Sequence, residues 1–295
     1  MSTCVAVGGS SNHTAPIAVL LMNLVENQTW FDNIIVFHDG ISKRNQALMQ
    51  KIAPVEFIRY HFPGKKSNFN EIVKYSFREM VFAKYECFRL LERFERVVWS
   101  DYDVVYLQDV PEIANDNPRG YKTLLYRPNT PTCLVRDQFR REAWRELEKL
   151  FDLDKLSIAT GFFALSRELA KWETYYDDCI SFTEKYGNIL VLPEQGVFDM
   201  VMHKHRFTPE VIPWTYAAHP VTDAHLLPEA KVLHTYSREK FWSGVDNADW
   251  NNRYRKWLDM GGTPYGVFSC KEFLRKINCS LAFRFNALKK KLHSK

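Results

Sequence analysis

Apolar runs and amphipathic segments alternate along the first hundred residues of the chain. Runs of strand length predict strands at Thr3–Val7, Asn33–Phe37, Val55–Tyr60 and Val97–Ser100. Apolar positions at helical spacing between these runs predict helices at Pro16–Glu26, Lys43–Ile52 and Ser76–Phe94. Strands and helices that alternate in this way indicate an α/β fold with a doubly wound, mainly parallel sheet flanked by helices.

The second half of the chain has a less regular pattern. It predicts helices at Arg136–Phe151, Glu168–Tyr186 and Glu194–His203. Its apolar runs predict strands at Ile158–Leu165, Leu190–Leu192 and Lys231–His234. No stretch rich in Gly, Ser or Pro resembles a linker before about residue 260. Residues 1–262 are therefore predicted to form one domain, followed by a separate C-terminal segment at 263–295.

Two aspartates interrupt the apolar stretch RVVWSDYDVVYLQDV. Asp101 and Asp103 flank Tyr102 at the end of a predicted strand, and apolar residues resume at Val104. Buried carboxylates are costly unless they are paired or bind a metal. Carboxylate oxygens at this place could hold Mg²⁺ or Mn²⁺, to which a bound diphosphate would add further ligands. The alternative is a solvated turn between two strands.

A second polar group follows the last predicted strand. His234 lies at its end and could add a nitrogen ligand to the same metal. Lys240, six residues later, could place its ammonium against a phosphate. A histidine satisfied by the backbone and a surface lysine are the alternatives.

Two further turns carry polar side chains next to predicted helices. Glu194 and Gln195 begin a helix, where the helix dipole favours an acidic side chain, although an ordinary N-terminal turn has the same composition. Residues 8–13, Gly-Gly-Ser-Ser-Asn-His, connect the first strand to the first helix. Because they match neither G-x-G-x-x-G nor G-K-[ST], they favour neither a dinucleotide fold nor a P-loop.

Composition restricts the class of protein further. The six cysteines form no C-x-x-C pair, which is typical of reduced thiols and predicts a cytoplasmic protein. The net charge of +5 arises at the C-terminus, where residues 270–295 contain eight Lys/Arg and one Glu. The rest of the chain is slightly acidic, which argues against a nucleic-acid-binding surface.

The C-terminal segment has the pattern of an amphipathic helix. Its apolar positions recur three or four residues apart, at Ile277, Leu281, Phe285, Leu288 and Leu292. Its basic side chains include Arg284, Lys289, Lys290 and Lys291. This composition suits peripheral attachment to an anionic membrane surface. A helix packed on the domain, with a solvated Lys-rich end, is the alternative.

Taken in order, these motifs resemble the family-8 retaining glycosyltransferases, which have a GT-A fold. The resemblance covers about residues 4–245. It rests on the H-D-G-I-S turn, the D-x-D motif, the strand I-A-T-G-F-F, the Glu-Gln pair and the spacing of His, Lys and Trp in HTYSREKFW. Each motif is weak by itself, but their common order is a strong signal. The basic C-terminus also resembles bacterial family members that act on lipid-linked oligosaccharides.

The resemblance implies transfer of a hexose from a nucleotide-diphosphate sugar, with UDP as the expected nucleotide, to a glycan or glycolipid hydroxyl. It implies Mn²⁺ or Mg²⁺ as the cofactor and retention at the anomeric carbon. The residues that match the family's metal ligands are Asp101, Asp103 and His234. Those at donor-binding positions are Asn12, His13, Lys84, Tyr102, Gly161 and Lys240. The pair near the anomeric carbon is Glu194, in place of the usual Asp, and Gln195.

Several positions depart from the family pattern. Residues 10–13 lack the Asp and Tyr that hold uracil, and Ala159 replaces an Asn that precedes Gly161. Ser237 and Phe241 replace the Gly and Pro of the closing motif, and Lys84 replaces an arginine. These departures leave open a non-catalytic protein that binds sugar nucleotides or membranes. A metal-dependent phosphohydrolase of sugar nucleotides is a third reading.

The aromatic residues after Pro213 have two interpretations. They are Trp214, Tyr216, Trp242, Trp250, Tyr254 and Trp257. They could form a stacking platform for an acceptor sugar, or they could belong to the core.

Overall fold

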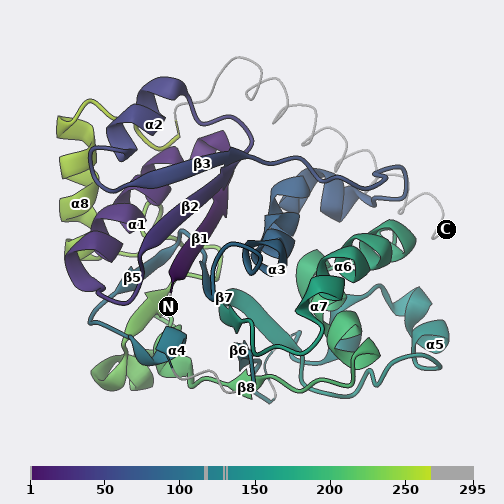
Figure 1. Cartoon of the computed structure of the whole chain (residues 1–295). Helices are drawn as coiled ribbons and strands as arrows, with labels where there is room; N and C mark the ends of the chain where they lie inside the picture. Colours follow the sequence, from purple (N-terminus) through teal and green to yellow (C-terminus); the bar gives the residue numbers. More distant parts are fainter. Residues whose placement is uncertain (1, 116–118, 129, 131, 267–295) are drawn as a thin grey trace, which may run out of the picture.

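The computed structural model describes residues 2–115, 119–128, 130 and 132–266, and its centre is a seven-stranded sheet (Figure 1). In spatial order the strands are β3 (Val55–Arg59), β2 (Asn33–His38), β1 (Thr3–Gly9), β4 (Arg96–Ser100), β7 (Ile158–Ser166), β6 (Tyr121–Leu125) and β8 (Glu210–Val211). β7 runs antiparallel to both its neighbours, and the other pairs are parallel. The predicted α/β fold with a mostly parallel sheet is therefore confirmed.

Helices cover both faces of this sheet (Figure 1). One face holds α1 (Thr14–Asn27), α2 (Lys43–Met49) and α8 (Ala248–Asp259), and the other holds α3 (Glu86–Leu90), α6 (Trp172–Tyr186) and α7 (Pro193–Lys204). Side chains of a strand point alternately to opposite faces, so β1 contributes to both layers. Cys4 and Ala6 belong to the core with α3, α6 and α7, whereas Val5 and Val7 pack with α1 and α8.

Shorter elements complete the domain. β5 (Val104–Tyr106) and β9 (Val232–His234) form a two-stranded antiparallel ribbon, and α4 (Glu112–Asn115) and α5 (Trp144–Leu147) are single turns. A π-helical segment spans Ile72–Phe77. The 3-10 turns are Ser11–His13, Glu79–Tyr85, Val135–Gln138, Arg141–Ala143, Trp214–Tyr216 and Ala224–Glu229.

The helix predicted over Ser76–Phe94 is wrong. The π-helical segment ends at Arg78, whose φ of 62° breaks the helix, and a 3-10 segment then leads into the short α3. Five of the seven side chains in the 3-10 segment are buried: Met80, Phe82, Ala83, Lys84 and Tyr85. One face of an α-helix could not bury so many neighbouring residues. This segment contacts β1 on one side and lines the cavity described below on the other.

The helix predicted over Arg136–Phe151 is also wrong. The main-chain amide of Arg140 donates to Ile189 O, and Val191 donates to Gln138 O. These partners replace the bonds that an α-helix would make, so only short turns form. The strand predicted at Leu190–Leu192 is reduced to an isolated bridge between Phe139 and Leu190. β6, β8 and α8 were not predicted.

The described residues of the predicted C-terminal segment contact the rest of the domain, and Tyr265 N donates to Tyr254 OH. Thr263 O accepts a hydrogen bond from Trp257 Nε1, and its hydroxyl contacts Asn45. The predicted basic helix, with Arg284, Lys289, Lys290 and Lys291, falls in residues 267–295 and lies outside the described residues. Among the described helices, none has the length and apolarity needed to cross a bilayer.

The β5–β9 ribbon is fixed to α1 by one buried side chain. Asn23 Oδ1 accepts a hydrogen bond from Tyr106 N at 2.6 Å, and Asn23 Nδ2 donates to Tyr106 O at 3.0 Å. Asn27 donates to the same carbonyl over 3.3 Å. Because Val104 pairs with His234 at the other end of the ribbon, Asn23 helps to hold the segments that carry Asp103 and His234.

We expect Asn23→Ala to lower the free energy of unfolding by about 2 kcal/mol, because it leaves the buried amide of Tyr106 without a partner. Urea unfolding followed by circular dichroism measures this change. Asn27→Ala is the matched control, and we expect it to cost less than about 1 kcal/mol because Tyr106 O keeps Asn23 as a donor. An equal loss in both variants would contradict the assigned role of Asn23.

Candidate functional site

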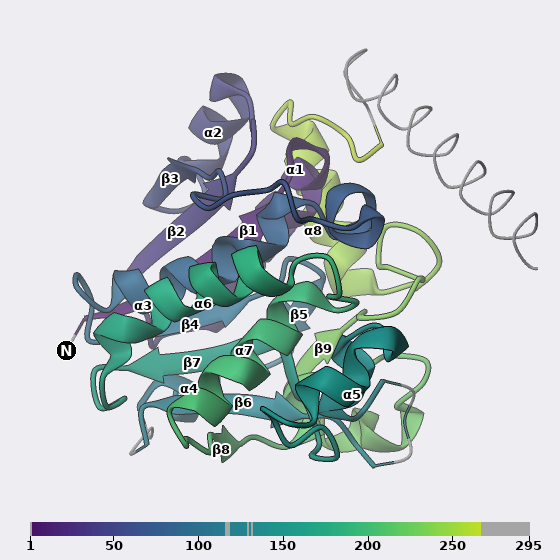
Figure 2. The same ribbon diagram turned by 90° about the vertical axis from the view of Figure 1, so that its right-hand side faces the viewer.

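A cavity of about 650 Å³ opens at the end of the sheet where the parallel strands have their carboxyl ends. Residues at the carboxyl ends of β1, β4, β6 and β8 line it, together with the beginning of the antiparallel β7. Figure 2 shows β4, β7, β6 and β8 following one another across the sheet. Ligands of open α/β sheets bind outside the carboxyl ends of the strands, so this cavity is the candidate site.

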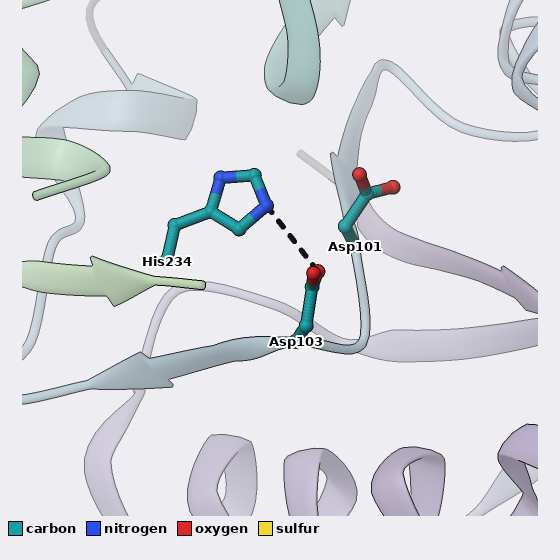
Figure 3. Close-up of side chains that lie close together, drawn as sticks. All are labelled: Asp101, Asp103 and His234. Atoms are coloured by element: carbon teal, nitrogen blue, oxygen red, sulfur yellow. Dashed lines mark ion pairs between the residues drawn. The ribbon is translucent and has the colours of Figure 1, made fainter. Parts of the chain in front are cut away.

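Three side chains that could hold a metal ion lie together in the lining of the cavity. Asp101 and Asp103 follow β4, and His234 ends β9, with their ligand atoms within 4.8 Å of one another. His234 Nε2 lies 3.2 Å from Asp103 Oδ1 (Figure 3). Two carboxylates and one imidazole could hold a divalent metal ion such as Mn²⁺ or Mg²⁺.

Gly161 on β7 makes this grouping possible. A Cβ at this position would lie 2.3 Å from His234 Cε1 and 3.2 Å from Asp101 Oδ2. Gly161 O also accepts a hydrogen bond from the amide of Asp101 at 2.9 Å. The missing side chain therefore leaves the space in which the imidazole and the carboxylate lie side by side.

Asp103 is held in its ionised form by cations. Lys240 Nζ lies 2.5 Å from Asp103 Oδ2, and it also donates to Thr235 O. Burial would raise the pKa of Asp103, but His234 and Lys240 outweigh this effect and hold that pKa well below its usual range. Asp103 is thus a charged carboxylate at neutral pH.

Lys84 connects Asp101 to Glu194. Its Nζ lies 3.4 Å from Asp101 Oδ1 and 3.0 Å from Glu194 Oε1, and its side chain is 7% exposed. Burial would lower the pKa of Lys84, but these carboxylates outweigh burial and raise that pKa above its usual value. Burial raises the pKa of Asp101, and Lys84 offsets part of that rise. Trp99 Nε1 donates to Asp101 Oδ1 at 2.7 Å.

Glu194 and Gln195 face the cavity from the first turn of α7. Thr160 Oγ1 donates to Glu194 Oε1 at 2.8 Å, whereas the buried Glu194 Oε2 has no hydrogen-bond partner among the described residues. Gln195 Oε1 accepts from Tyr126 OH at 3.2 Å, and Gln195 Nε2 donates to Gln138 Oε1 at 3.2 Å. The pair predicted from sequence therefore lies in one cavity with the predicted metal ligands.

The turn after β1 forms the other end of the cavity. Asn12 and His13 line it, and the ring of His13 stacks on Tyr102 with centroids 4.4 Å apart. Ser11 N donates to Asp39 Oδ1 at 2.7 Å, and Arg78 Nη1 lies 3.6 Å from Asp39 Oδ2.

Sequence reasoning missed several residues of the cavity. Arg78 was placed inside a continuous helix, and Tyr126 follows a strand that was not predicted. Tyr236 lies between His234 and Lys240, within the motif that was recognised, and also lines the cavity.

The positions that depart from the family pattern have structural partners. Ser237 Oγ lies 2.9 Å from His219 Nε2. His219 Nδ1 accepts from the amides of Val221 and Thr222, so Nε2 carries the proton and donates to Ser237. Phe241 is buried and stacks near Trp250. These contacts fix the segment between His234 and Lys240.

A family model decides the relationship of this chain. The model of glycosyl transferase family 8 matches residues 4–245, which include the whole cavity. The chain belongs to glycosyl transferase family 8. It is therefore a glycosyltransferase, as the motifs predicted. A comparison with curated proteins gave no match.

Solved structures have the same fold as this transferase. The bifunctional glycosyltransferase WbbM in its apo form has 12% identity and a TM-score of 0.63 over 88% of this chain, which spans about half (51%) of WbbM. The galactosyltransferase LgtC, in complex with donor and acceptor sugar analogues, has 11% identity and a TM-score of 0.59 over 92% of this chain and 99% of LgtC. The apo form of GlyE from Streptococcus pneumoniae has 14% identity and a TM-score of 0.55 over 88% of this chain and 64% of GlyE.

A buried carboxylate of the transferase lies one turn after Gln195 on α7. Asp199 accepts hydrogen bonds from Ser157 Oγ at 2.5 Å and Ile158 N at 3.5 Å, which ties α7 to the start of β7. Burial raises the pKa of Asp199 to about 7, and these two hydrogen bonds offset burial only in part.

This raised pKa makes the stability of the transferase depend on pH. Below the pKa of the unfolded state Asp199 is protonated in both states, whereas between pH 4 and about 7 unfolding releases its proton. The free energy of unfolding therefore falls as pH rises, and Asp199 contributes at most about 1.4 kcal/mol per pH unit to this fall. We expect Asp199→Asn, which cannot ionise, to gain stability relative to the wild type from pH 5 to 7 and to level off above that.

Urea midpoints of both proteins at pH 5, 6, 7 and 8 measure the difference, in which the other titrating groups cancel. Asp152→Asn, at an exposed position, is the control with no expected trend. A difference between Asp199→Asn and the wild type that stays constant with pH would refute a raised pKa at Asp199.

Proposed function

We propose that this transferase moves a hexose from a nucleotide-diphosphate sugar to a hydroxyl of a glycan or glycolipid, with Mn²⁺ or Mg²⁺ and with retention at the anomeric carbon. The observation that carries the proposal is the grouping of Asp101, Asp103 and His234 beside Lys240 in the cavity. LgtC, whose structure holds donor and acceptor sugar analogues, has the same fold over nearly its full length, which supports two substrate positions in this cavity.

From the order of the strands we propose a position for each part of the donor. The turn after β1, with His13 stacked on Tyr102, faces the base, for which we propose uracil. The carboxylates after β4 and the ammonium of Lys240 face the diphosphate. Gly161 on β7 and Glu194 on α7 face the hexose, where the unpartnered Oε2 of Glu194 can accept a hydrogen bond from a sugar hydroxyl.

The charged groups act on the leaving diphosphate. A bound divalent ion supplies Lewis-acid stabilisation of the negative charge that develops there. Lys240 contributes a second positive charge at the same place, because its Nζ already lies beside Asp103. Lys84 holds Asp101 and Glu194 in position through its two ion pairs.

Retention without an enzyme nucleophile fits the surroundings of Glu194. One of its oxygens accepts from Lys84 and Thr160, which lowers the nucleophilicity of the carboxylate. Gln195, bound by Tyr126 and Gln138, is an amide and the weaker nucleophile of the pair. We therefore propose a front-side displacement, in which the acceptor hydroxyl attacks on the side of the leaving diphosphate.

Thermal unfolding tests the identity of the donor. The midpoint is measured with UDP, GDP, CDP and their common sugar conjugates, each with and without Mn²⁺. Ligand binding to the folded state raises the midpoint by mass action, by about 2.7 kcal/mol of added stability at a ligand concentration of 100 Kd. We expect a metal-dependent shift with UDP and one UDP-sugar. A shift confined to another nucleotide would show that the proposed base, uracil, is wrong. No shift with any nucleotide would favour the non-catalytic alternative.

Asp103→Ala is the matched variant for the metal site. It should lose both the Mn²⁺-dependent shift and Mn²⁺-stimulated turnover, because one charged ligand is removed. Asp152→Ala, an exposed carboxylate that does not line the cavity, should keep both. A full metal response in Asp103→Ala would exclude this residue as a ligand.

We also propose that residues 263–295 attach the transferase to anionic membranes from the cytoplasmic side. The basis is the basic amphipathic pattern around Arg284, Lys289, Lys290 and Lys291. The full chain should sediment with phosphatidylglycerol vesicles, less so at high salt, and only weakly with phosphatidylcholine.

Replacing the three lysines by glutamate should abolish sedimentation, since each basic residue contributes about 1 kcal/mol near an anionic surface. Replacing them by arginine keeps the charge and should keep attachment. Equal sedimentation of the glutamate and arginine variants would rule out electrostatic attachment by this segment.

A further inference from the structure

One end of the cavity is lined by three aromatic side chains. Tyr126 follows β6, Trp214 follows β8, and Tyr236 follows β9. The centroids of Trp214 and Tyr236 lie 5.8 Å apart in an edge-to-face arrangement, and those of Tyr126 and Trp214 lie 6.4 Å apart. We call these three residues the aromatic wall.

The aromatic wall lies on the far side of the proposed hexose position from the nucleotide turn. Across the sheet the order is β1, β4, β7, β6 and β8, so the nucleotide turn and the wall occupy opposite ends. Neighbouring strands are about 4.8 Å apart, which separates β8 from β4 by roughly 14 Å. A donor hexose over β7 leaves the space next to the wall for a second sugar ring.

The rings of the wall are fixed in place. Trp214 Nε1 donates to Leu125 O at 2.8 Å, and the guanidinium of Arg127 lies 4.6 Å from the Trp214 ring centroid. Tyr236 OH donates to Asp223 Oδ2 at 3.0 Å. The hydroxyl of Tyr126 donates to Gln195 Oε1, which connects the wall to the proposed reaction centre. Such rigid aromatic surfaces bind ligands at a low entropic cost.

The charge of the wall is neutralised internally. Arg127 forms an ion pair with Asp223, with Nη2 and Oδ1 2.5 Å apart. The guanidinium is therefore already matched by a carboxylate and covers a ring, so it does not select an acidic sugar. Aromatic faces instead suit the apolar C–H face of a pyranose.

We propose that the aromatic wall is the acceptor site and that it takes an uncharged pyranose, stacked on Trp214. This inference rests on the proposed transferase reaction and names its acceptor class. The acceptor hydroxyl oxygen forms a bond to the anomeric carbon as the bond from that carbon to the diphosphate oxygen breaks. The bonding electron pair leaves with the nucleoside diphosphate, and the hydroxyl proton passes to the diphosphate oxygen.

A glycan array tests the acceptor class with the labelled full-length protein, in the presence of UDP and Mn²⁺. The array carries glycans that end in neutral hexoses and matched glycans that end in sialic or uronic acids. We expect the wild type to bind neutral ends, Trp214→Ala to bind them roughly tenfold more weakly, and Trp214→Phe, which keeps an aromatic face, to retain most of the binding.

Trp144→Ala is the matched control. Trp144 resembles Trp214 because its Nε1 donates to a main-chain carbonyl, of Phe139 at 3.2 Å, and Arg136 lies 5.3 Å from its ring, but it does not line the cavity. Its variant should bind glycans like the wild type. With an acceptor found on the array, Trp214→Ala should raise the acceptor KM more than it lowers kcat.

The outcomes separate this inference from the proposed function. The nucleotide-induced thermal shift reports the donor site, and glycan binding reports the wall. Three results would overturn the inference: preference for acidic ends, equal binding by Trp214→Ala and the wild type, or no binding of any glycan by a wild type that responds to nucleotide. A cooperative thermal transition shows that each variant is folded. If Trp214→Ala does not fold, the binding of Trp214→Phe and of the wild type still tests the inference.

Discussion

The structure of the cavity depends on the ion pairs that stabilise two aspartates at the end of a buried strand. Asp101 and Asp103 lie where β4 leaves the sheet, and each has its own lysine. Lys84 comes from the segment before β4, and Lys240 comes from beyond β9, more than a hundred residues later. Buried ions are tolerated only when paired and hydrogen-bonded, so the two lysines make a low-dielectric D-x-D motif possible.

These ion pairs determine much of the surrounding architecture. Lys84 must reach two carboxylates from a buried position, and the 3-10 segment that carries it follows the break at Arg78. His234 must approach Asp103, and it does so because β9 pairs with β5 and because Gly161 has no side chain. The main-chain bonds of Asn23 then fix the ribbon to α1. Elements from all parts of the domain thus converge on two charges.

The sequence predicted those features that repeat within a short window. The strands β1, β2 and β4 are largely apolar on both faces because helices cover both, so their continuous apolar runs are visible without any tertiary information. The segment around Arg140 looked helical because its local pattern is helical, yet the amide of Arg140 donates to Ile189 O and the carbonyl of Gln138 accepts from Val191 N. Such partners are not encoded in a window of sequence, and the helix predicted over Arg136–Phe151 is wrong for this reason, whereas the one over Ser76–Phe94 is broken locally at Arg78.

The residues of the site also divide into those that the sequence pointed to and those that only the structure shows. The sequence pointed to Asp101, Asp103 and His234 because the D-x-D motif and the histidine each follow an apolar strand, and the pairing of β9 with β5 brings them together. Trp214 was recognised as a member of an aromatic group, but the sequence did not show that it lines the cavity whereas Trp250 and Trp257 of α8 are buried in the core. β7 is antiparallel and separates β4 from β6, which sets the distance between the charged centre and the aromatic wall. The order of strands, more than any single motif, therefore determines which side chains line the two ends of the cavity.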